Sequence, residues 1–259
     1  MRVNDLLLPI DQFARYAETQ PDEIYWRQPV DGHYHETSWA EAYDQTLRLA
    51  AGFRELGLQP GDKVAILSEN CAEWFLTDFA LIAAGLISVP IYFTAGAGTI
   101  SYVLEHSEAK AIVVGKLADY SQAQEAIGDD IMTIAMPYDS MPCRYQLRQL
   151  IADNQPLEDL ARPDIDDMFS ITYTSGSTGN PKGVVLTFRN IMFGANAMSN
   201  LPDRPEKERV ISYLPLAHIT ERALIEYTSL YNGGTVSFNE SLATFVDDLK
   251  SARVTFFLS

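Results

Sequence analysis

Short apolar runs of strand length alternate with longer helix-like stretches along this chain, and that alternation limits the folds open to it. Residues 63–67 and 110–114 are rich in apolar and β-branched side chains, and helix-like segments separate such runs from one another. Strands that alternate with helices pair in parallel, because each helix carries the chain back to the start of the next strand. The sequence therefore predicts an α/β fold of layered βαβ units with a largely parallel sheet.

Capping residues and glycines set the expected bounds of the helices. Ser38 and Glu41 form a capping box for a helix that runs to about Leu56. Asn70 with Glu73 indicates a cap for a second helix, which Gly85 is expected to end. Pro90 favours a strand end or a sheet edge. Strands are further expected over 87–91, 131–135, 168–174, 183–188, 209–214 and 254–259, and helices over 99–106 and 190–200, the last capped by Asn190.

The pattern breaks over residues 153–167, which hold two prolines and six acidic side chains. We expect a boundary or an exposed connection there. The expected division is an N-terminal α/β subdomain over 1–160 and the start of a second subdomain over 161–259. Because the β-rich run 254–259 stops abruptly at the last residue, we expect the chain to be the N-terminal part of a longer protein.

The composition narrows the range of partners. The formal net charge is −16, which argues against nucleic-acid binding and requires local positive groups for any anionic ligand. Cys71 and Cys143 lie in no C-x-x-C pair, so a reduced, cytoplasmic setting is expected. The longest apolar stretch, 79–93, is shorter than a membrane span and is predicted to be a helix end leading into a buried strand. Peripheral membrane contact to collect a lipid substrate stays open.

Residues 173–183, YTSGSTGNPKG, carry the strongest functional signal. Glycines let a backbone turn and approach a ligand closely, and backbone N–H groups in such a turn form an anion-binding concavity. Hydroxyl groups add donors, and Lys182 adds a positive charge. Pro181 and Gly183 flank the lysine where a Walker A loop needs glycine and Ser or Thr. The stretch therefore predicts a different kind of polyphosphate loop, placed between two buried strands.

The same stretch resembles the signature of the AMP-forming, acyl-adenylating enzymes, which include acyl-CoA synthetases, luciferases and adenylation domains of peptide synthetases. A second block, YLPLAHITER at 213–222, is similar to a stretch of the long-chain fatty acyl-CoA synthetase branch. The resemblance implies that the chain is the N-terminal part of the large domain of such an enzyme. The complete enzyme would activate a fatty acid with ATP to acyl-AMP and pyrophosphate, and coenzyme A would then displace AMP.

The resemblance also implies roles for single residues. Lys182 would contact the outer phosphates of ATP, and His218 would lie beside the acyl carboxylate and the α-phosphate, so both are expected to act in catalysis. Thr174 opens the loop at a position that lies near Mg²⁺ in some members of the family. The residues expected to bind ATP are Thr174, Ser175, Gly176, Ser177, Thr178, Gly179 and Lys182.

Other residues of the second block have weaker expectations. Glu221 and Arg222 are interpreted as a helix-end ion pair that contributes little stability. Tyr213 and Leu214 fit an acyl channel or the core equally well. Trp26, Trp39 and Trp74 are expected to be packing residues, and His33, His35 and His106 are assigned no role.

The family blocks that hold adenine, ribose and metal, and the C-terminal domain with its catalytic lysine, are not found in these 259 residues. We therefore expect the chain alone to bind nucleotide weakly, to form no thioester and to self-associate through an interrupted sheet edge. Three alternatives stay open: a fatty acyl-AMP ligase that serves a carrier protein, a kinase or NTPase that releases ADP, and a non-catalytic nucleotide-binding module. The acyl chain length is open as well.

Overall fold

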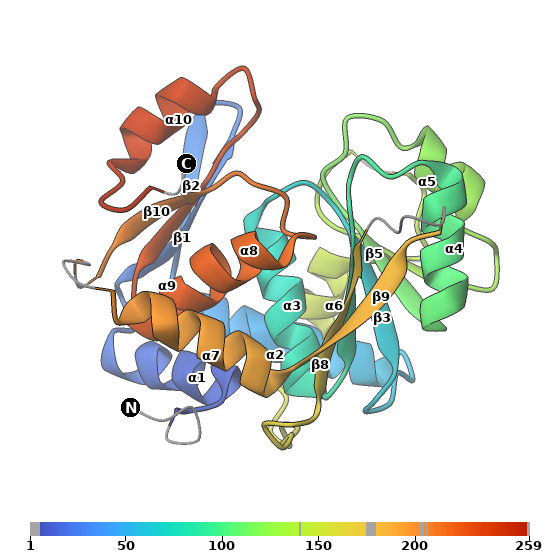
Figure 1. Cartoon of the computed structure of the whole chain (residues 1–259), viewed down its shortest axis with the longest axis horizontal. Helices are drawn as coiled ribbons and strands as arrows, with labels where there is room; N and C mark the ends of the chain where they lie inside the picture. Colours follow the sequence, from blue (N-terminus) through green and yellow to red (C-terminus); the bar gives the residue numbers. More distant parts are fainter. Residues whose placement is uncertain (1–5, 140, 175–179, 202–204, 206, 258–259) are drawn as a thin grey trace.

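Two β-sheets and the helices packed around them make up the fold in the computed structural model, which describes residues 6–139, 141–174, 180–201, 205 and 207–257. Figure 1 shows the sheets on opposite sides of the molecule with helix α3 between them. The helices are α1 (Pro9–Thr19), α2 (Trp39–Glu55), α3 (Ala72–Ala84), α4 (Ala97–Ser107), α5 (Ser121–Ala126), α6 (Leu147–Asp153), α7 (Phe188–Ser199), α8 (Ile219–Glu221), a π-helical segment (Arg222–Tyr227), α9 (Thr228–Asn232) and α10 (Phe245–Ala252).

The larger sheet has seven strands in the order β7-β6-β5-β3-β4-β8-β9. All neighbouring pairs are parallel except β8 and β9. Its strands are β3 (Lys63–Leu67), β4 (Ile87–Ile91), β5 (Ala111–Val114), β6 (Met132–Ala135), β7 (Tyr145–Gln146), β8 (Met168–Thr174) and β9 (Lys182–Thr187). The predicted α/β class with a largely parallel sheet is confirmed.

The smaller sheet has four strands in the order β10-β11-β1-β2, and only β1 and β2 are antiparallel. Its strands are β1 (Ile24–Val30), β2 (His33–Ser38), β10 (Arg209–Ser212) and β11 (Thr235–Phe238). The first two therefore come from the start of the chain and the last two from near its end. Both sheets combine strands from the two sides of residue 160, and the division of the chain at that point stays a prediction.

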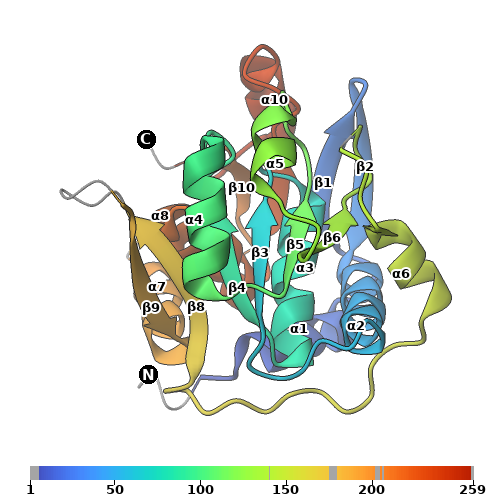
Figure 2. The same ribbon diagram turned by 90° about the vertical axis from the view of Figure 1, so that its right-hand side faces the viewer.

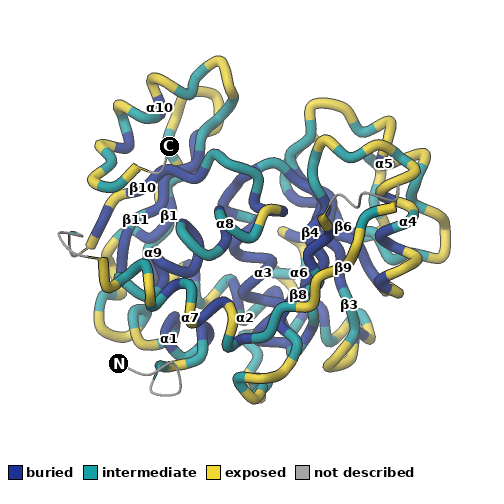
Figure 3. Tube along the Cα trace, in the orientation of Figure 1, coloured by how far each residue is buried: buried dark blue, intermediate teal, exposed yellow. Residues whose placement is uncertain are grey.

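Helix α3 forms the centre of the core. Glu73 is its one residue that is not buried, because the helix is covered by neighbouring elements on every side (Figure 3). The side chains of Trp26, Trp39 and Trp74 are at most 2% exposed, which confirms their packing role. Gly85 ends α3 in the left-handed conformation at φ 75°, as predicted.

Residues 154–167 connect α6 to β8 as an extended segment along one end of the molecule (Figure 2). The segment is irregular but attached: Leu157 N donates to Leu47 O at 3.1 Å and Ala161 N to Ala83 O at 2.9 Å. The break in the sequence pattern therefore marks a connection that lies against α2 and α3.

Two predicted helix caps are wrong in detail. Asn70 does not cap α3, because Gln28 Oε1 accepts the hydrogen bond from Ala72 N at 2.9 Å and no side chain caps the helix at Cys71. Helix α7 begins at Phe188, two residues before Asn190; Thr187 is the cap, and Asn190 is its capping-box partner. The Ser38–Glu41 capping box of α2 is confirmed.

Two expectations about strands are also wrong, those for β9 and for residues 254–259, and the expectation for Pro90 is confirmed in one of its two alternatives. β9 is an exposed edge strand, with Val184 and Val185 43% and 52% exposed, whereas β8 is mostly buried as predicted. β4 is an interior strand between β3 and β8, so Pro90 lies near a strand end and not at a sheet edge. Residues 254–257 form no strand; Thr255 N donates to Arg209 O at 2.8 Å, which ties this segment to the start of β10.

Candidate active site

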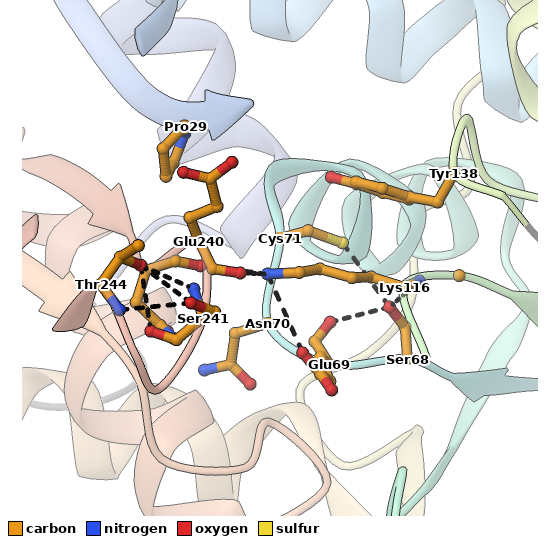
Figure 4. Close-up of polar contacts among 12 residues, drawn as sticks. Pro29, Ser68, Glu69, Asn70, Cys71, Lys116, Tyr138, Glu240, Ser241 and Thr244 are labelled. Carbon is orange, nitrogen blue, oxygen red and sulfur yellow. Dashed lines mark hydrogen bonds and ion pairs between the residues drawn. The ribbon is translucent and has the colours of Figure 1, made fainter. Parts of the chain in front are cut away.

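The carboxyl ends of the two sheets are joined by side chains that reach from one sheet to the other. Figure 4 shows Lys116, which follows β5, extending between residues 68–71 and the segment after β11. Its Nζ donates to Asn239 O at 3.1 Å and to Glu240 O. Ligands of open α/β sheets bind beyond the carboxyl ends of the strands. Thr174 at the end of β8 and the segment 213–218 after β10, which belong to the two family blocks, lie at these ends.

The hairpin of β8 and β9 brings Thr174 and Lys182 opposite each other. The two residues are register partners at the loop end of the antiparallel pair, and both are exposed. Side chains directly opposite in such a pair have Cβ atoms about 5 Å apart. The five predicted ATP-binding residues between them, Ser175, Gly176, Ser177, Thr178 and Gly179, lie outside the described residues. The structure thus places the two ends of the predicted phosphate loop side by side.

Local packing explains two residues of this hairpin. A Cβ atom at Gly183 would lie 3.1 Å from Ile171 Cγ2 and 3.3 Å from the Tyr173 ring, so a larger residue would push β9 away from β8. The Tyr173 hydroxyl lies 2.8 Å from Nδ1 of His106 on α4, and Tyr173 is 5% exposed. His106, which the sequence left without a role, therefore anchors the strand that leads into the loop.

The segment 213–218 ends at His218, which caps the short helix α8. His218 Nδ1 accepts a hydrogen bond from Thr220 N at 3.2 Å, and the ring is exposed. When Nδ1 accepts, the proton of a neutral imidazole is on Nε2. The exposed ring therefore presents a donor that suits an anionic oxygen. In Figure 1 the chain leading into α8 lies between the two sheets.

Glu221 is buried, and this corrects the expectation of a helix-end ion pair. Its side chain is 1% exposed, and Oε1 accepts hydrogen bonds from Ser212 Oγ and Tyr213 N, both at 2.9 Å. Burial raises the pKa of Glu221 to about 7, although these two bonds favour the ionised form. Glu221 thus holds the end of β10 instead of pairing with Arg222.

Arg222 is fully buried and pairs with Asp78 of α3. Its Nη2 lies 2.8 and 2.7 Å from the two carboxylate oxygens, and Nη1 donates to Ser170 Oγ of β8 at 2.9 Å. The guanidinium also lies 4.6 Å from the centroid of Phe169. Arg222 therefore links the second family block to the strand that leads into the phosphate loop.

A second acid completes this buried group. Glu226 is buried with its Oε2 3.6 Å from Arg222 Nε, and burial followed by the charge of Asp78 raises the pKa of Glu226 well above its ordinary value. Tyr227 donates from its hydroxyl to Asp78 Oδ2 at 2.6 Å. Asp78 matches the one positive charge of Arg222, which favours the protonated form of Glu226. We call Arg222, Asp78, Glu226 and Tyr227 the arginine cluster.

Sequence reasoning missed Asp78 and Asn70. Asp78 gave a signal, because it is the one acid within the apolar run of α3 after its first turn, and a buried carboxylate needs a partner. The sequence signal at Asn70 was misleading, because the spacing of Asn70 to Glu73 matches a helix cap. Its amide instead turns toward the segment after β10.

A cluster of metal ligands and a reactive thiol are two further kinds of group that could serve such a site. Among the described residues no group of three or more histidine, cysteine, aspartate or glutamate side chains could hold a metal ion. Thr174 offers one exposed hydroxyl, and its place near Mg²⁺ stays a prediction. Burial raises the pKa of the Cys71 thiol to about 12, so this cysteine does not act as a thiolate nucleophile.

In the part of the chain that the structure describes, no helix is both long and apolar enough to span a bilayer.

Comparison with known proteins defines the class. Residues 13–259 match the family of AMP-binding enzymes, and the chain belongs to this family. It is 32% identical over 255 residues to the long-chain-fatty-acid–CoA ligase FadD15 of Mycobacterium tuberculosis, a match that covers 94% of this chain and 42% of the relative. It is 33% identical over 244 residues to fatty acyl-CoA synthetase A of Dictyostelium discoideum, covering 87% and 36%. The chain thus spans about two fifths of the length of these curated relatives.

Solved structures confirm the fold. The anthranilate CoA ligase AuaEII in complex with anthranoyl-AMP superposes with a TM-score of 0.84 at 18% identity, covering 97% of this chain and 49% of that one. The N-terminal domain of FACL13 from Mycobacterium tuberculosis gives a TM-score of 0.82 at 22% identity, covering 96% and 62%. The family inferred from the two sequence blocks is confirmed, and the roles of Thr174, Lys182 and His218 stay predictions.

Proposed function

We propose that the natural protein is an ATP-dependent, AMP-forming ligase that activates a long-chain fatty acid and transfers it to coenzyme A. One observation carries the proposal: the hairpin ends Thr174 and Lys182 and the segment 213–218 lie at the carboxyl ends of the strands in a member of the AMP-binding family. The matched relatives are named as long-chain fatty acid–CoA ligases and fatty acyl-CoA synthetases, which supports this substrate class.

The first step joins two anions, and the site residues suit that problem. A fatty carboxylate oxygen attacks the α-phosphorus of ATP, a new O–P bond forms, and the bond to the bridging oxygen breaks to release pyrophosphate. Lys182 would offset charge on the departing phosphates, and Nε2 of His218 would donate to an oxygen of the carboxylate or of the α-phosphate. These local groups matter because the whole chain carries a formal charge of −16.

The second step consumes the acyl-adenylate. The coenzyme A sulfur bonds to the acyl carbon, the bond to the phosphate oxygen breaks, and AMP leaves. Mg²⁺ would enter with ATP. The single exposed hydroxyl of Thr174 fits such an ion, because Mg²⁺ in nucleotide sites is held mainly by phosphates and water.

Palmitate-dependent exchange of labelled pyrophosphate into ATP tests the first step. We expect exchange that requires palmitate and Mg²⁺, and release of AMP but no ADP once coenzyme A is added. ADP release, or exchange that proceeds equally without an acid, would contradict the proposal. Replacing palmitate by octanoate or benzoate tests chain length, and formation of palmitoyl-CoA tests the acceptor.

The setting of the enzyme is part of the proposal. We propose a cytoplasmic protein that contacts membranes at their surface to collect its lipid substrate, and that self-associates. The exposed edge strand β9, with Val184 and Val185 on its surface, supports self-association, because an open strand edge can pair with another chain. Sedimentation with and without phosphatidylcholine vesicles tests both points.

A further inference from the structure

We propose that Asn70 is a positioning residue of the adenylation site, which fixes the segment 213–218 and through it the ring of His218. This inference rests on the proposed function. Asn70 lies in the loop between β3 and α3, so it belongs to the seven-stranded sheet, whereas the segment it holds leaves the four-stranded sheet at β10.

The amide group of Asn70 makes three hydrogen bonds to Ser212 and to this segment. Nδ2 donates to Ser212 Oγ at 2.8 Å and to Leu214 O at 2.7 Å, and Oδ1 accepts from Leu216 N at 3.3 Å. The side chain is 5% exposed, so water cannot readily replace these partners. Two donors and one acceptor in this planar arrangement are a feature of asparagine and glutamine amides among side chains of this size.

Glu221 holds the same segment from its other end. Its Oε1 accepts from Ser212 Oγ and from Tyr213 N, so Ser212 is bonded to both Asn70 and Glu221. The remaining turn is closed by His218 N, which donates to Pro215 O at 2.9 Å. Five backbone groups from Tyr213 to His218 are therefore fixed before the chain reaches the imidazole.

The consequence for catalysis is specific. The hydrogen bonds of the Asn70 side chain go to residues 212–216 and not to the described part of the β8–β9 hairpin that would bind the phosphates, so its loss should leave the affinity for ATP intact. A displacement of about 1 Å at a reacting group can lower a rate by about a hundredfold. Loss of the amide should therefore lower the chemical step through His218 and spare nucleotide binding.

The test compares Asn70→Ala with Asn154→Ala in the natural protein. Asn154 is a matched control, because it is also buried, at 6% exposure, and its amide donates to Leu150 O four residues away in the chain. We expect Asn70→Ala to lower the kcat of palmitate-dependent exchange about a hundredfold while KM for ATP changes by less than about threefold. Asn154→Ala, measured at the same folded fraction, should keep kcat within about threefold of wild type.

A double variant tests whether Asn70 acts through His218. If it does, Asn70→Ala combined with His218→Ala should be no slower than His218→Ala alone, since the positioned group is already gone. Multiplying rate losses would overturn the inference, and so would equal kcat values for Asn70→Ala and Asn154→Ala.

Hydrogen exchange separates this inference from the proposed function. The Leu216 amide should lose at least tenfold protection in Asn70→Ala and not in Asn154→Ala, whatever reaction the enzyme catalyses. Unchanged protection of the Leu216 amide would show that Asn70 does not fix the segment 213–218. Lost protection in a protein without palmitate-dependent exchange would refute the proposed function and leave the structural role of Asn70 standing.

Discussion

Removing the charge of Arg222 should destabilise the fold far more than removing an exposed cation. Arg222→Met leaves the Asp78 carboxylate buried at 0% exposure with Tyr227 as its remaining hydrogen-bond donor, and it also leaves Ser170 without the guanidinium. Truncating one partner of a buried ion pair costs about 3–5 kcal/mol. Because whole domains are stable by about 5–15 kcal/mol, the variant should lose a large share of its stability.

Urea unfolding followed by tryptophan fluorescence measures this loss, since Trp74 lies against the guanidinium at 5.4 Å. Lys250→Met is the control, because Lys250 pairs with Asp247 at the surface with 73% and 86% of the two side chains exposed. The control should keep the wild-type midpoint.

A double-mutant cycle tests whether the expected loss of stability comes from the Arg222–Asp78 ion pair. Asp78→Leu with Arg222→Met replaces the pair by apolar side chains, so the double variant should be more stable than the sum of the single losses predicts, by at least about 2 kcal/mol. Glu226→Gln should change stability by less than about 1 kcal/mol, because burial favours the protonated form of Glu226 and glutamine has the same shape and charge as that form. Additive losses, or an Arg222→Met variant as stable as Lys250→Met, would refute the cluster as described.

Three further predictions concern the second block and the phosphate loop. Lys182→Ala should lower palmitate-dependent pyrophosphate exchange about a hundredfold by weakening phosphate contacts, and an unchanged rate would rule out its assigned role. His218→Ala should slow single-turnover adenylation more than it weakens ATP binding; a large affinity loss with unchanged chemistry would contradict this. For Glu221 the folded pKa of about 7 exceeds the ordinary value of 4.5, so the folded state binds the extra proton and stability should fall as pH rises from 4.5 through 7, by about 3 kcal/mol in total. Glu221→Gln should flatten that slope in urea titrations at pH 5.5 and 8, and an unchanged slope would show that another group titrates.

Signals that act over a few residues predicted the local structure well. The Ser38–Glu41 box, the left-handed Gly85 and the apolar runs of β3, β5 and β6 each depend on neighbours within one turn or one strand. Such signals do not depend on how the sheets assemble. The βαβ order also determined the parallel pairing, because a helix between strands imposes it.

Contacts between distant parts of the chain could not be predicted from the sequence. Asn70 and Ser212 are 142 positions apart, and Asp78 and Arg222 are 144 apart. Each pair meets only because the two sheets face each other across α3. The prediction that β9 is buried was wrong for the same reason. Its sequence is as apolar as that of a buried strand, and only the strand order places it at a sheet edge.

The parallel pairing of β1 with β11 has a consequence for synthesis of the protein. Trp26 is in register with Val236, so β1 waits for a partner made about 200 positions later, which at 5–20 residues per second is roughly 10–40 s. The strands from β3 to β7 lie within one continuous stretch of chain and can pair during that interval. A ribosome that stalls before β11 would therefore leave one edge of β1 unpaired, and this early strand edge is where a nascent-chain chaperone should bind.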